Sequence, residues 1–176
     1  SIGVMTAKDD AAQMSQGAGM TFRNNIEWLA GNYNEARMGS SIFSYLMGYE
    51  DPRLSVYFLP MDGNASYGVE AFDGKTYQAV PAGHANAQND IYKSCSKPNI
   101  QSGTPTYWLR ASEVYFLRAE AALVWEGFGS ADSWYKQGID MSFQENGVTD
   151  PVDDYMNSNL SPRAYVLSHY QYGQTL

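Results

Sequence analysis

The chain has 176 residues and a net charge of −8, from 19 acidic and 11 basic residues. Its basic residues are scattered singly, which argues against nucleic acid or an anionic lipid surface as a partner, because both need clustered positive charge. The single cysteine, Cys95, excludes an intramolecular disulfide and a multi-thiolate metal site. The length is that of about one domain.

The first predicted element is a helix. Residues 1–19 are rich in Ala, Gly, Ser and Gln, and within them residues 17–19 (Gly-Ala-Gly) predict a flexible connection. The apolar spacing further along predicts a helix over residues 34–47, with Asn34 as its N-cap and Gly48 at its end.

A proline stops this helix. Pro52 cannot continue the backbone hydrogen bonding, and the neighbouring Arg53 is expected to pair either with Asp51 or with a helix carbonyl. Residues 54–59 alternate only loosely between apolar and polar types, so they predict a short extended segment packed on the helices.

Residues 61–106 have little periodicity and predict a long loop excursion, a kind of segment that is commonly functional. A sugar presents apolar C–H faces and many hydroxyls, so a glycan site needs aromatic rings beside amides and carboxylates. The candidate ligand-binding residues in this loop are Tyr67, Phe72, Tyr77, Asn86 and Tyr92. The alternative interpretation is that these aromatic residues anchor the loop to the helices.

Residues 62–68 carry oxygen donors at alternate positions, as a calcium-binding loop does. The turn glycine comes one residue late, at Gly68, and Asp73 stands where glutamate is expected for bidentate binding. A polar turn is the preferred interpretation, and no metal site is predicted.

Residues 111–146 predict two antiparallel helices of the tetratricopeptide type, which sets the fold class as mainly α. Large and small residues alternate as in such a unit, at Tyr115, Ala119, Ala131, Tyr135 and Gly138. Gly127 and Gly147 are suitable helix ends, and Ser130 is a suitable N-cap for the second helix.

No catalytic constellation is visible in the sequence. His84 and His169 belong to no spaced metal motif, and no nucleophile elbow or phosphate-binding glycine loop occurs. Glu113 suits a helix N-terminus, and Arg110 and Arg118 suit pairing between helices. The chain is therefore predicted to be a binding protein, not an enzyme, with no cofactor.

Five segments of the chain carry a family resemblance: residues 48–54 (GYEDPRL), 77–83 (YQAVPAG), 109–122 (LRASEVYFLRAEAA), 134–139 (WYKQGI) and 142–148 (SFQENGV). They resemble the SusD/RagB family of outer-membrane nutrient-binding lipoproteins. Members of that family are considerably longer, so the resemblance implies a single incomplete SusD-like domain over residues 1–176.

The resemblance also implies a function. It implies capture of an oligosaccharide or polysaccharide at the cell surface and delivery to a TonB-dependent outer-membrane transporter, by a protein that is lipid-anchored in its full-length form. The matching segments are scaffold motifs and do not specify the ligand. A peptide or another nutrient in the same uptake role stays an alternative, as does a tetratricopeptide-type scaffold that binds only protein.

Overall fold

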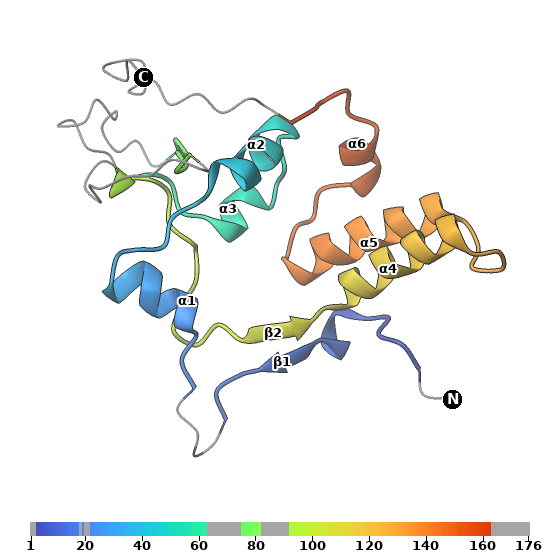
Figure 1. Cartoon of the computed structure of the whole chain (residues 1–176), viewed down its shortest axis with the longest axis horizontal. Coiled ribbons are helices and arrows are strands. Elements are labelled where there is room, and N and C mark those ends of the chain that lie inside the picture. The colour runs from blue at the N-terminus through green and yellow to red at the C-terminus, as the bar shows by residue number, and fades with distance from the viewer. Residues whose placement is uncertain (1–2, 18, 20–21, 63–74, 82–91, 163–176) are drawn as a thin grey trace. The chain divides into compact units, whose positions relative to one another are not determined.

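The computed structural model of the chain describes residues 3–17, 19, 22–62, 75–81 and 92–162. The chain forms two compact units. Unit 1 comprises Ser1–Phe22 and Gly103–Ser158, and unit 2 comprises Arg23–Ser102 and Asn159–Leu176. The described elements are mostly helices (Figure 1), which confirms the predicted mainly α fold. Within the described ranges, no helix has the length and apolar character needed to cross a bilayer.

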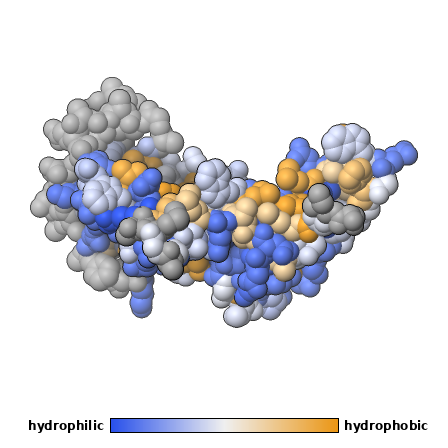
Figure 2. Space-filling model, turned by 90° about the horizontal axis from the view of Figure 1, so that it is seen from below, coloured by the Kyte–Doolittle hydropathy of each residue, from blue (hydrophilic) through white to orange (hydrophobic). Residues whose placement is uncertain are grey.

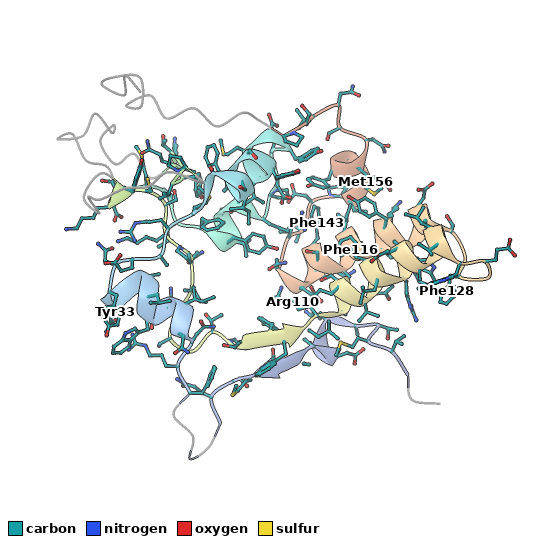
Figure 3. All side chains as sticks on the ribbon, viewed as in Figure 1. Tyr33, Arg110, Phe116, Phe128, Phe143 and Met156 are labelled. Carbon is teal, nitrogen blue, oxygen red and sulfur yellow. The ribbon has the colours of Figure 1, made fainter. Side chains whose placement is uncertain are left out.

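Unit 1 is built on a helical hairpin. Helices α4 (Ala111–Val124) and α5 (Ala131–Glu145) lie side by side (Figure 1), at the positions predicted for residues 111–146. Gly138 of α5 lies directly against Phe116 of α4, since an added Cβ atom would lie 2.6 Å from Cε1 of Phe116. Figure 3 labels Phe116 within the hairpin. A residue larger than Gly138 would require Phe116 to move, which explains the small residue in the predicted pattern.

The alternation of large and small residues fills the hairpin interior. Ala111 is fully buried and Ala119 is 7% exposed, so the helix backbones approach at both positions. Tyr115 is buried beside them, and its ring lies 6.1 Å from that of Trp134. Met141 completes this cluster from α5.

The helix caps follow the predicted pattern. The Ser130 hydroxyl accepts a hydrogen bond from the backbone N–H of Ser133 at 3.3 Å, which caps α5. Gly127 and Gly147 have φ angles of 87° and 68°, the left-handed conformation that suits glycine after a helix.

A two-stranded antiparallel ribbon adjoins the hairpin. Strand β1 (Ala12–Met14) pairs with β2 (Thr106–Leu109), and the short 3-10 helix η1 (Lys8–Asp10) precedes β1. The sequence predicts no strand here, because strands of three and four residues carry too little alternation to be recognised. The flexible connection predicted at residues 17–19 follows β1 and lies partly outside the described residues.

Helix α6 (Val152–Met156) covers the end of the hairpin. The Tyr155 ring meets Phe143, which is 2% exposed, at a centroid distance of 5.4 Å. Lys136 of α5 also forms an ion pair with Asp153. Figure 3 labels Phe143 and Met156 on these two helices.

In unit 2 the helix predicted over residues 34–47 is shorter at its start. Helix α2 (Ser40–Gly48) begins six residues later, so the prediction was wrong for residues 34–39. The backbone of this segment is held extended by long-range bonds: Met38 N–H donates to Ser96, and Val80 N–H donates to Met38, both at 2.8 Å. Asn34 has a φ of 58° and lies outside the helix.

The end of α2 also differs from the prediction. The residue with positive φ is Glu50, at 50°, and Gly48 is still helical. Asp51 then accepts hydrogen bonds from the Arg53 backbone N–H and from Nε, both at 2.9 Å, which confirms the predicted pair. This turn starts helix α3 (Leu54–Tyr57), so the extended segment predicted for residues 54–59 was wrong.

The core of unit 2 combines α2 with pieces of the predicted loop excursion of residues 61–106. Met38 and Ala79 are fully buried, Phe43 is 8% exposed and Cys95 is 1% exposed. The Cys95 thiol donates to the Ala79 carbonyl at 3.7 Å, and burial raises its pKa to about 11. The interpretation of Cys95 as a small buried residue fits this position.

Candidate functional site

The five predicted ligand-binding residues divide into two groups. Tyr67, Phe72 and Asn86 lie outside the described residues. Tyr77 and Tyr92 are described, and both belong to unit 2.

The two described tyrosines take part in the packing of unit 2. Tyr77 packs, partly buried, against the cluster of Met38, Phe43 and Ala79, and this burial raises the pKa of its hydroxyl. Tyr92 is 7% exposed. Their packing matches the anchoring interpretation of the loop aromatics, and their contact with a ligand stays a prediction.

An exposed aromatic surface lies elsewhere in unit 2, on α1 (Asn25–Glu27) and the π-helix η2 (Trp28–Asn32). The side chain of Asn24 accepts a hydrogen bond from the N–H of Ile26 at 3.0 Å and caps α1. The Trp28 ring is 38% exposed, Tyr33 is 60% exposed, and the two centroids are 5.6 Å apart.

The π-helix explains why these two rings meet. The N–H of Tyr33 donates to the carbonyl of Trp28 at 3.1 Å, five residues back, so the chain makes a wider turn than in an α-helix. In a regular α-helix residues five apart point about 140° away from each other. In the wider turn the two side chains emerge on the same side.

Polar groups surround Trp28. The Arg23 guanidinium lies 4.2 Å from the Trp28 ring centroid, its Nε donates to Glu27 at 2.6 Å, and its Nη2 donates to Asn32 at 3.0 Å. The hydrogen bond from Arg23 lowers the pKa of Glu27, which therefore stays an anionic acceptor at neutral pH. We call Arg23, Glu27, Trp28, Asn32 and Tyr33 the Trp28 surface.

The Trp28 surface has the composition that glycan binding requires. Exposed rings can stack on the C–H faces of a sugar, and a carboxylate, an amide and a guanidinium can bond its hydroxyls. Figure 2 shows that apolar residues lie exposed among hydrophilic ones on one face of the molecule. Sequence reasoning missed this surface because the spacing of Trp28 and Tyr33 fits neither helix nor strand periodicity.

A second segment ties the Trp28 surface region to the loop excursion. Arg37 donates from Nη2 to the backbone carbonyl of Lys93 at 2.7 Å and to Asn34 Oδ1 at 2.7 Å. Partial burial lowers the pKa of Arg37, although a guanidinium stays charged at neutral pH. Among the described residues, no group of three His, Cys, Asp or Glu side chains is placed to hold a metal ion.

Comparison with known proteins identifies the family. The family model SusD-like, described as Susd and RagB outer membrane lipoprotein, matches residues 1–176. A SusD homologue from Bacteroides thetaiotaomicron is 32% identical, with a TM-score of 0.77, over 93% of this chain and 32% of that one. A SusD homologue from Bacteroides ovatus is 30% identical, with a TM-score of 0.81, over 97% of this chain and 34% of that one.

A chitin-binding SusD homologue from Flavobacterium johnsoniae is 28% identical, with a TM-score of 0.82, over 96% of this chain and 33% of that one. The chain thus spans about a third of the length of these solved structures. A search of curated proteins finds no match. The fold defines a protein of helical hairpins with an exposed aromatic surface, and the chain belongs to the SusD-like family.

Proposed function

We propose that this chain is part of a non-catalytic binding protein of the outer membrane, which captures a glycan at the cell surface and delivers it to a TonB-dependent transporter. The observation that carries the proposal is the family match over residues 1–176, whose description is an outer membrane lipoprotein. The likeness to a chitin-binding homologue, with a TM-score of 0.82, supports a glycan as the ligand.

The ligand surface in this proposal lies on unit 2. Its contacts are the Trp28 surface and, as the sequence predicts, Tyr67, Phe72 and Asn86 of the loop excursion, which lie outside the described residues. Tyr77 contributes the exposed part of its ring. Tyr92, which is buried, holds the loop in place.

Binding follows from stacking and hydrogen bonding without bond cleavage. The Tyr33 ring, 60% exposed, offers the most open stacking surface of the Trp28 surface. The carboxylate of Glu27 and the amide of Asn32 accept hydrogen bonds from sugar hydroxyls. Because Arg23 holds both acceptors, they are oriented before the ligand arrives, which lowers the entropy lost on binding.

The test is calorimetric titration of the chain with chitotriose, maltotriose, cellotriose and the peptide trialanine. Tyr33→Ala is expected to weaken the binding of the preferred trisaccharide about fivefold, since an aromatic contact contributes about 1 kcal/mol. Tyr45→Ala is the matched control, because Tyr45 is 57% exposed and lies in the same unit. Equal losses for both variants, or binding of trialanine alone, would contradict the proposal.

A further inference from the structure

Unit 1 contains a cleft that the proposed function does not use. Its volume is about 590 Å³, within the range of roughly 300–1,000 Å³ that small-molecule sites occupy. Its lining includes Lys8, Asp9, Gln13, Tyr107, Arg110 and Gln144. All of these residues belong to unit 1, so the cleft is a feature of that unit alone.

The ribbon provides one wall of the cleft. Gln13 of β1 stands opposite Tyr107 of β2 in the strand register, so the two side chains share one face of the ribbon. The next residue, Trp108, projects from the other face because side chains alternate along a strand. Trp108 is absent from the cleft lining and is 72% exposed.

Arg110 closes the cleft between the ribbon and the hairpin (Figure 3). Its guanidinium lies 3.8 Å from the Tyr107 ring centroid, and its Nη1 donates to Asn146 at 3.3 Å and lies 3.9 Å from Glu145. Glu145 has a 4% exposed side chain and accepts a hydrogen bond from the Ser112 hydroxyl at 2.6 Å. The arginine is therefore fixed through Nη1, and its Nε and Nη2 have no partner among the described residues.

The charges that line the cleft cancel. Lys8 and Arg110 are cationic, and Asp9 and Glu145 are anionic, so the cleft favours neither an anion nor a cation. Among the residues that the structure describes, the Gln13 amide has no hydrogen-bond partner. Gln144 uses its Nε2 on Asp140 at 2.8 Å and keeps its carbonyl oxygen as an acceptor. Donors and acceptors are thus mixed around one partly exposed aromatic ring.

We propose that this cleft is a second ligand site, which binds a short neutral oligosaccharide. One sugar ring packs on the exposed part of Tyr107, and its hydroxyls bond Gln13, Gln144 and the remaining donors of Arg110. The place of the site rests on the geometry of unit 1, and the choice of a sugar rests on the proposed function.

The test is an NMR titration of the ¹⁵N-labelled chain with the three trisaccharides named above. Saturable shifts of amides in β1, β2 and the end of α5 are expected. Gln13→Ala should reduce the affinity at these amides about fivefold. Gln13 is exposed, so replacing it does not threaten folding. Tyr107→Phe is a second variant, which keeps the aromatic ring on which the sugar is proposed to pack.

Trp108→Ala is the matched control from the other face of β2, and it should leave the affinity unchanged. Shifts confined to unit 2 would overturn the second site and leave the proposed function standing. A third outcome is that amides of the cleft shift, that Gln13→Ala reduces the affinity measured there, and that no amide of the Trp28 surface shifts. This outcome would support the second site and contradict the ligand surface proposed for unit 2. If no trisaccharide shifts the cleft amides at millimolar concentration, the second site is refuted.

Discussion

Units 1 and 2 reach stability by different routes. In unit 1 two regular helices pack through alternating large and small side chains, with Gly138 directly against the Phe116 ring. In unit 2 the helices are short, and backbone hydrogen bonds between distant segments, such as those of Met38 with Ser96 and Val80, hold the interior. The comparison shows that one chain can combine a locally specified scaffold with a region that depends on long-range pairing.

This difference fits a division of roles. A helical hairpin with its own caps is stiff, since each end is satisfied locally. A region of short elements leaves backbone turns and side chains at its surface, where binding residues are usually found. The Trp28 surface lies in the second kind of region, on a π-turn of five residues.

The largest expected loss of stability comes from a substitution in the helical hairpin of unit 1. Phe143→Ala removes a side chain that is 2% exposed and packed on Tyr155. Loss of its burial and the resulting cavity should reduce the free energy of unfolding by about 4 kcal/mol, measured by urea denaturation. Phe128→Ala is the control, because Phe128 is 49% exposed and its loss should cost far less.

The second largest loss of stability is expected from a substitution in unit 2. Asp51→Ala leaves Arg53 without its carboxylate in a pair whose side chains are 4% and 15% exposed. The expected loss is about 2 kcal/mol of unfolding free energy, measured in the same way. A double-mutant cycle with Arg53→Ala isolates the pair. Full additivity of the two losses would show that the pair contributes nothing.

A smaller effect tests the local specification of α5. Ser130→Ala removes the side-chain oxygen that caps the helix and should lower the unfolding free energy by about 1 kcal/mol. Ser130→Asp keeps an acceptor at the cap and should retain the stability. An alanine variant as stable as the original chain would mean that packing alone sets the start of α5.

The smallest change in stability near neutral pH is expected from the titration of Cys95 in the interior of unit 2. Burial raises the pKa of Cys95 from 9.0 to about 11. The folded chain therefore holds this proton more tightly than the unfolded chain, so stability is unaffected below about pH 9 and falls between pH 9 and 11. Urea midpoints across that range should fall for the original chain and less for Cys95→Ala. Rapid alkylation of Cys95 at pH 8 in the folded chain would contradict its burial.

The two routes also decide what the sequence could predict. The hairpin of residues 111–146 was predicted with its caps because periodicity and capping residues are local signals. The ribbon and the extended residues 34–39 were missed because their hydrogen bonds join segments far apart in the chain. The local sequence of a segment does not show which distant segment it will pair with.

For the site, the sequence predicts aromatic rings beside amides, and the ligand contacts that it names stay a prediction. Among them, Tyr92 is buried and Tyr77 packs on the core of unit 2. Trp28 and Tyr33 meet only because a π-turn brings residues five apart together. Residue spacing alone does not reveal such a turn.

We propose that the protein binds a glycan and leaves it intact. This is tested by a glycan-array screen with the chain, followed by calorimetry on the strongest hit and mass spectrometry of the sugar after incubation. We expect saturable binding that Tyr33→Ala weakens, and recovery of the sugar unchanged. Cleavage of the sugar, or binding of peptides with no glycan bound, would contradict it.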